Sequence, residues 1–268
     1  INPKISIGAD PMNDFSISFE YNMQNNTEND ILQLPEKIAI EKGIQIVICI
    51  DEFQQISDFE DSKTFQKKLR SVWQLQQHVS YCLFGSKKHL MNELFEKKNL
   101  PFYKFGDAIY LAKIETKYWI EYICKRFENT GKHISPELAE EICRLVDNHS
   151  SYVQQLSWLL WIRTINTATT EQLSYALEDL LDQNNILFQS ETENLSAYQM
   201  NFLKAIVDGI HTKFSSKEVI SKYNLGTSAN IVRLKNALLQ KELIETNGKE
   251  IVLADPVFGV WFKKEMLY

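Results

Sequence analysis

Two adjacent carboxylates that follow a continuous apolar run are the sharpest chemical signal in the sequence. Residues 44–50 are rich in β-branched side chains, a pattern typical of a strand buried on both faces of a parallel sheet. Asp51 and Glu52 come directly after this run, at the carboxyl end of the strand, where α/β sheets bind ligands. Carboxylates at that edge could take part in a ligand site, although a solvated acidic pair would have the same sequence. Both interpretations stay open on these two residues.

A hydroxyl follows the next predicted strand. Residues 79–84 form a second apolar run, and Gly85 and Ser86 come directly after it. Since the carboxyl ends of parallel strands meet at one edge of a sheet, we expect Ser86 to lie near Asp51 and Glu52. Lys87 and Lys88 are nearby cations. The alternative is a loop serine beside two surface lysines.

The elements that would position these side chains indicate an α/β layer. Helices are expected over residues 28–42 and 62–78, and a third strand over residues 108–111. Strand, helix, strand in this order implies crossover connections and a parallel sheet. Alternating apolar residues over 5–21 predict a β-hairpin before the first helix.

Helical patterns dominate the second half of the chain. Ser135 precedes a first-turn proline, and Thr169 and Gln172 have the spacing of a capping box. We expect three or four helices over residues 117–186, forming an all-α lid. Residues 183–194 show no clear period and are the expected linker.

The last part of the chain has the element order of a winged helix. Capping boxes are expected at Ser196 with Gln199 and at Ser215 with Glu218, opening helices near 197–208 and 216–223. A third helix over 227–240 precedes two short strands, joined by a predicted type I′ turn at Asn247-Gly248. A terminal helix near 256–266 is expected to pack back on the rest. These patterns predict three regions, which are residues 1–115, 116–190 and 191–268.

Four segments together resemble a known family. They are residues 49–54, 83–86, 150–156 and 253–261. Their order resembles small archaeal and bacterial AAA-like P-loop ATPases, of AAA+ and STAND type, that carry a winged helix after the lid. The resemblance implies an α/β P-loop NTPase-type parallel sheet with ATP and Mg²⁺ as cofactors. In one place the chain departs from this family, because His149-Ser150-Ser151 stands where relatives often have Gly-x-Pro, so no sensor role is carried over to that turn.

The resemblance also implies a role for each candidate residue. Asp51 would hold the magnesium ion through water, Glu52 would be the catalytic base of the Walker B element, and Ser86 would sense the γ-phosphate. The chain would then be the C-terminal portion of a P-loop ATPase acting as an ATP-dependent molecular switch. The alternative is a non-enzymatic winged-helix module that binds DNA or protein.

No phosphate-binding loop of the form G-x-x-x-x-G-K-[ST] occurs in the 268 residues. Gly131-Lys132 and Gly248-Lys249 are the Gly-Lys pairs, and Ser or Thr follows neither. We therefore expect an incomplete sheet that lacks the P-loop strand, and no ATPase activity in this chain. In the family that strand lies between residues 79–84 and 108–111. The slot could be closed by direct pairing, filled by the 5–21 hairpin, or paired in a second copy through open sheet edges.

The charge distribution bears on partners. The chain has a net charge of −6, but residues 194–268 hold ten Lys and Arg against seven Asp and Glu. On the expected third helix of the winged helix, Ser228, Asn230, Arg233 and Lys235 are the candidate contact residues. Because two basic residues are few, we expect protein contact ahead of DNA contact.

The four cysteines are expected to be reduced core residues, and Trp158 and Trp161 are expected to lie in the core. The composition predicts a cytoplasmic protein without a membrane span or a metal cluster.

Overall fold

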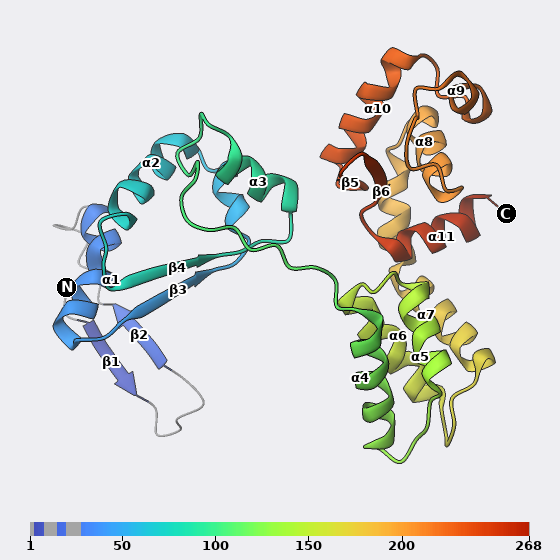
Figure 1. The fold of residues 1–268 in the computed structure, drawn as a ribbon, viewed down its shortest axis with the longest axis horizontal. Helices are drawn as coiled ribbons and strands as arrows, with labels where there is room; N and C mark the ends of the chain where they lie inside the picture. Colours follow the sequence, from blue (N-terminus) through green and yellow to red (C-terminus); the bar gives the residue numbers. More distant parts are fainter. Residues whose placement is uncertain (1–2, 8–14, 20–27, 268) are drawn as a thin grey trace. The chain divides into compact units, whose positions relative to one another are not determined.

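The computed structural model describes residues 3–7, 15–19 and 28–267, which form two compact units. The first unit is Ile1–Tyr110 and the second is Leu111–Tyr268, and each has its own hydrophobic core. Figure 1 shows the sheet-containing unit at the blue end of the chain and the helical unit from green to red. None of the described helices is both long enough and apolar enough to cross a membrane.

A parallel strand pair forms the centre of the first unit, as predicted. β3 (Ile46–Ile50) pairs in parallel with β4 (Val79–Leu83). α1 (Glu28–Lys42) packs on both strands, and α2 (Ser62–Trp73) packs on α1. The expected helix at 28–42 is confirmed at both ends, whereas α2 ends five residues before the expected position 78. It ends early because the Glu36 carboxylate accepts the backbone N–H groups of Gln77 and His78, which holds them outside the helix.

The prediction that this sheet is buried on both faces is wrong. Side chains alternate between half-buried and exposed along β3, and Val47 is 65% exposed. α1 packs on both strands, and among the described residues the side chains on the other face, including Val47, Cys49 and Cys82, are exposed. The apolar runs therefore follow the pattern of a fully covered sheet, while the described part of the chain covers half of it.

The predicted third strand is also absent from the structure. Residues 108–111 form no regular element, and Ile109 and Leu111 are 85% and 93% exposed. A strand needs a neighbour to take its backbone hydrogen bonds, and these residues have none among the described strands. The predicted hairpin forms its own antiparallel sheet from β1 (Pro3–Ile7) and β2 (Phe15–Phe19). It pairs with neither β3 nor β4 and does not fill a slot beside them; its turn lies outside the described residues.

Short helices complete the first unit. η1, a 3₁₀ helix (Phe53–Asp58), follows Glu52 directly, and α3 (Lys88–Glu96) follows Ser86. Both pack together, and the core beneath them includes Phe53 and Phe102, whose rings meet edge to face at 5.4 Å. This aromatic packing fixes the chain on both sides of the candidate site residues.

Four helices open the second unit, in agreement with the three or four helices expected over residues 117–186. Ser135 caps the second of them by accepting the Leu138 N–H, and Thr169 and Gln172 form the predicted capping box of the fourth. The helices are α4 (Thr116–Glu128), α5 (Pro136–Leu145), α6 (Ser150–Arg163) and α7 (Thr170–Glu193).

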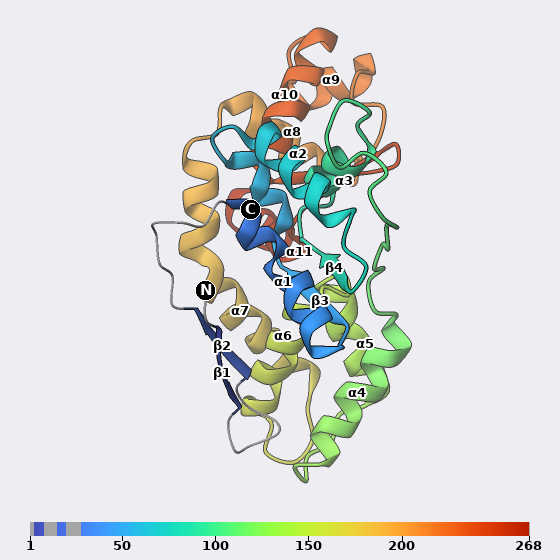
Figure 2. The same ribbon diagram turned by 90° about the vertical axis from the view of Figure 1, so that its left-hand side faces the viewer.

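The predicted linker at 183–194 is wrong, because these residues continue α7. Phe188 within this stretch is 1% exposed and meets the ring of Phe258 at 5.4 Å. Trp261 Nε1 donates to Asn185 Oδ1 at 2.8 Å. α7 can be followed as one long helix in Figure 2. One hydrophobic core continues from Trp119 to Phe262, so the lid helices and the winged helix share an interior.

The winged-helix element order is confirmed. Its elements are α8 (Ala197–Val207), α9 (Lys217–Tyr223), α10 (Ser228–Gln240), β5 (Ile244–Asn247), β6 (Glu250–Leu253) and α11 (Pro256–Leu267). α11 packs back on α7 and α8, as expected.

Two local predictions in this region are corrected. The capping box at Ser196 and Gln199 forms, but Ser216, not Ser215, caps α9 by accepting the Val219 N–H. In the hairpin, Asn247 pairs with Glu250, so the two turn residues are Gly248 and Lys249. Gly248 has a positive φ of 61° and Lys249 does not, as in a type II′ turn and not the predicted I′.

Two of the four cysteines are not core residues. Cys143 is buried and Cys124 is partly buried, but Cys49 and Cys82 are exposed. Trp158 is also 56% exposed, against the expectation that it lies in the core. All three exposed side chains lie on faces that the described residues leave uncovered.

Candidate functional site

The ends of the two parallel strands are held together by backbone hydrogen bonds that continue past the strands. Phe84 N–H donates to Ile50 O, and Phe53 N–H donates to Phe84 O, both at 3.0 Å. These bonds bracket the acidic pair on one side and Gly85 and Ser86 on the other. The two strand ends therefore lie together, as predicted.

Glu52 and Ser86 are in direct contact. Ser86 Oγ lies 2.9 Å from Glu52 Oε1 and 3.2 Å from Oε2, close enough to donate a hydrogen bond to the carboxylate. The Glu52 backbone has a positive φ of 49°, which costs a non-glycine residue about 1–3 kcal/mol. The Asp51 carboxylate offsets part of that cost by accepting the Glu52 N–H at 2.8 Å. The local sequence thus holds Glu52 in an unusual conformation that directs it toward Ser86.

Gln54 is a third member of the site that the sequence analysis did not single out. Its side chain is 2% exposed, and its Nε2 donates to Glu52 Oε2. A Cβ atom at Gly85 would lie 1.9 Å from Gln54 Oε1, so Gly85 provides the space that Gln54 occupies. Little in the sequence singled it out, because the same segment contains other polar residues, Gln55, Ser57 and Asp58.

These contacts lower the pKa of Glu52 below its ordinary value. The hydrogen bond from Gln54 is the largest cause, followed by that from Ser86, with Lys87 adding a favourable charge. The carboxylate is therefore ionised at neutral pH and acts as a hydrogen-bond acceptor. Such a group orients a water molecule well, but it takes up a proton only weakly.

Asp51 is exposed beside this pair. Its carboxylate is a hard oxygen ligand of the kind that magnesium prefers, and magnesium commonly uses one or two carboxylates together with water and phosphate oxygens. No group of three or more His, Cys, Asp or Glu residues gathers to hold a metal within the described ranges. A cation at Asp51 would therefore depend on water and a ligand for its remaining bonds.

The candidate contact residues of the winged helix lie on α10. Ser228 and Arg233 are exposed, whereas Asn230 and Lys235 are partly buried. The Asn230 side chain donates to Leu225 O at 3.0 Å, so its amide already holds the loop before α10. The hairpin beside α10 carries three exposed glutamates, Glu242, Glu245 and Glu250, against two exposed lysines, Lys241 and Lys249.

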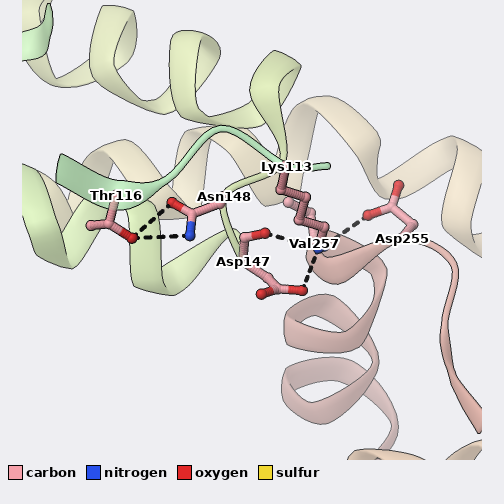
Figure 3. A network of polar contacts seen from close by, with 6 residues as sticks. All are labelled: Lys113, Thr116, Asp147, Asn148, Asp255 and Val257. Carbon is pink, nitrogen blue, oxygen red and sulfur yellow. Dashed lines mark hydrogen bonds and ion pairs between the residues drawn. The ribbon is translucent and has the colours of Figure 1, made fainter. Parts of the chain in front are cut away.

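A second polar cluster joins the segment that enters the second unit to the turn between α5 and α6. Lys113 Nζ lies 2.9 Å from Asp147 O and 2.6 Å from Asp147 Oδ2, and Thr116 exchanges hydrogen bonds with Asn148. Asp147 and Asn148 both have positive φ, at 47° and 53°. Figure 3 shows these residues close to the start of α11, where Asp255 accepts the Val257 N–H. The cluster fixes the turn that contains His149.

Comparison with solved structures identifies the architecture. The Walker-type ATPase PABY2304 of Pyrococcus abyssi matches with a TM-score of 0.69 at 16% identity, over 91% of this chain and 72% of that one. This chain has the fold of a Walker-type ATPase. The Aeropyrum pernix ORC2 protein matches with a TM-score of 0.46 at 13% identity, over 93% of this chain and 73% of that one. The Thermotoga maritima RuvB Holliday junction branch migration motor matches with a TM-score of 0.43 at 13% identity, over 91% and 76%.

The C-terminal region has a family match of its own. Residues 186–264 match the family described as a probable winged helix domain. The match begins inside α7, which agrees with a helix shared between the lid and the winged helix. No curated protein sequence matches the chain. The chain therefore shares its fold with the Pyrococcus abyssi protein, and its C-terminal region matches a probable winged helix domain.

Proposed function

We propose that this chain carries the Walker B and sensor elements of a P-loop ATPase that acts as an ATP-dependent molecular switch. The observation that supports this best is the contact between Ser86 and Glu52 across the ends of two parallel strands. A solvated acidic pair with no function would not need a buried glutamine and a strained backbone to hold one of its carboxylates. The fold likeness to a Walker-type ATPase supports the same proposal.

Each residue then has a defined task. Asp51 holds the water shell of a magnesium ion, Glu52 accepts a hydrogen bond from the attacking water, and Ser86 donates to the γ-phosphate. Magnesium, when bound, neutralises charge on the transferred phosphoryl group. The lowered pKa of Glu52 keeps it ionised and able to orient that water. Because no phosphate cradle occurs in these 268 residues, we propose that other residues supply it.

Ser86 also provides a physical link between ligand and catalyst. Its hydroxyl has one proton, which it donates either to Glu52 or to a phosphate oxygen. A phosphate that accepts this hydrogen bond removes one of the hydrogen bonds that restrain the Glu52 carboxylate, leaving those from Gln54 and from the Ser86 backbone N–H. The restrained arrangement is the one in the structure.

ATP hydrolysis by the full-length natural protein tests this proposal. Glu52→Gln should retain ATP binding and lose turnover by roughly 10²–10⁴-fold, the usual contribution of a positioned acid or base. Asp51→Asn should raise the magnesium concentration needed for half-maximal turnover. Glu60→Gln, an exposed residue of the same unit, is the matched control. Wild-type turnover in Glu52→Gln contradicts the catalytic assignment.

The chain of 268 residues gives a second test. Isothermal titration with Mg-ATP should show no micromolar binding, because Asp51 and Glu52 position a magnesium ion and a water only when something else holds the phosphates. Micromolar affinity would show that a phosphate site exists within these residues. The proposal that other residues supply the phosphate cradle would then be wrong.

The partner of the winged helix is a separate proposal. We propose protein contact ahead of DNA contact, supported by the glutamates on the hairpin and by the commitment of Asn230 to Leu225 O. The open edges of the β3–β4 sheet are a second route to a protein partner, through strand pairing between copies. Sedimentation over a range of concentrations tests self-association, and a monomer at every concentration contradicts it.

A further inference from the structure

Two thiols lie side by side on the face of the β3–β4 sheet that α1 does not cover. Cys49 and Cys82 are directly paired in the parallel register of the two strands. Both are exposed, and the alternation of burial along each strand places them on the same face. Val47 and Phe84, 65% and 44% exposed, are their apolar neighbours along that face.

The spacing of these thiols favours a bridge over a direct bond. Neighbouring strands lie about 4.8 Å apart, and the Cβ atoms of in-register partners in a parallel pair lie at about the same distance. A disulfide prefers Cβ atoms roughly 3.5–4.5 Å apart and a sulfur–sulfur bond of about 2.05 Å. Two metal–sulfur bonds of about 2.3 Å in a line span about 4.6 Å. A single metal ion between the sulfurs therefore fits the sheet without moving either strand.

We propose that Cys49 and Cys82 bind one soft metal ion in two-coordinate, near-linear geometry. Cysteine sulfurs select soft cations such as Cu(I), and the apolar face offers little to a hard, hydrated ion. Within the described ranges no third His, Cys, Asp or Glu completes a cluster, so a tetrahedral zinc site lacks its ligands there. Magnesium would instead bind at the carboxylate of Asp51, beyond the end of β3. Hard and soft ions would therefore bind at different sites.

A metal ion at this site would also restrain the nearby ends of β3 and β4. Cys49 lies two residues before Asp51, and Cys82 lies four residues before Ser86. An ion that joins the two sulfurs ties β3 to β4 close to the ends that carry Glu52 and Ser86. It also adds a link to a sheet whose outer edges have no partner among the described strands.

Titration of the reduced chain with silver(I), a redox-inert soft cation, tests the site. Native mass spectrometry should show one tightly bound ion, and Cys49→Ser and Cys82→Ser should each weaken binding at least 100-fold. Cys124→Ser, which changes a partly buried thiol outside the site, should keep wild-type affinity and stoichiometry. Full binding in either strand variant would overturn the proposal.

A second measurement does not depend on the stability of the variants. In the wild-type chain, maleimide should label Cys49 and Cys82 rapidly, and one equivalent of silver(I) should protect both at once. Protection of one thiol without the other would overturn the bridge. Rapid conversion of the metal-free pair to a disulfide by hydrogen peroxide, detected as a linked peptide, would overturn the spacing on which the proposal rests.

Discussion

The hydroxyl of Tyr152 on α6 donates a hydrogen bond of 2.5 Å to Asp255 Oδ2 at the start of α11. The other carboxylate oxygen of Asp255 accepts the backbone N–H groups of Val257 and Phe258, which caps α11. Tyr152 is 8% exposed, so this bond lies largely out of water. One carboxylate thus joins a lid helix to the last helix of the winged helix.

Removal of this hydroxyl should destabilise the whole second unit. Tyr152→Phe keeps the ring and leaves Asp255 without one partner, which should lower the free energy of unfolding by about 1.5–3 kcal/mol, as for hydrogen bonds to charged groups. Urea unfolding followed by circular dichroism measures the change. Tyr198→Phe, at a 45% exposed position on α8, is the control and should have little effect. Equal effects in the two variants would contradict the prediction.

The same pair predicts a loss of stability at alkaline pH. Burial, the hydrogen bond to Asp255 and its negative charge raise the pKa of Tyr152 far above its ordinary value. The folded chain therefore keeps the phenol neutral where the unfolded chain ionises it. This contribution to stability is fully present below pH about 10 and is lost as the pH rises above it. In urea titrations from pH 8 to 11, Tyr152→Phe should lose less stability than the wild type, and parallel curves would refute the assignment.

Gly85→Ala should disturb the candidate site through Gln54. The new Cβ would overlap Gln54 Oε1, which cannot move outward because the side chain is buried and bound to Glu52. Overpacking of this kind costs about 1–3 kcal/mol. Gln54→Ala creates space, so the double variant should be more stable than the sum of the two single changes predicts. A double-mutant cycle by urea unfolding measures this coupling, and additivity within about 0.5 kcal/mol would contradict it.

Arg233→Ala tests whether the winged helix binds DNA. Arg233 is exposed on α10, and loss of one phosphate contact should weaken binding and lower the salt slope by about 1. A shift assay at low salt with duplex DNA measures both. Lys264→Ala, exposed on α11, is the matched control. No binding by the wild-type chain would favour the protein-contact proposal.

The sequence predicted most clearly the elements whose ends are set by local chemistry. α1 ends at Gly43, which has a positive φ of 64°, and Ser135, Thr169 and Ser196 cap the helices that they were expected to cap. The strand ends at Glu52 and Ser86 could be predicted because an apolar run followed by polar residues has few other interpretations. These features depend on residues close together in the chain.

Predictions that depended on distant partners were less successful. Residues 108–111 have a strand-like composition, but a strand requires a neighbour, which composition does not provide. Residues 183–194 lack a clear period because apolar residues stand on both sides of α7 there, with Phe188 buried and Ile186 82% exposed. Gln54 was missed because its role depends on the space at Gly85, 31 positions later in the chain. Each of these features is set by tertiary contacts.

The helix α7 limits where the chain can be cut into fragments that keep their packing. A fragment that begins at residue 191 would lack Asn185 and Phe188, which contact Trp261, and would leave that tryptophan and Phe258 facing water. Such a fragment would retain the hairpin and α10 while losing the wall against which α11 packs. Recombination or truncation that keeps residues 111–268 together preserves every aromatic partner of α11. Residues 111–268 are therefore one structural module, and a movement of α4–α7 would carry the winged helix with it.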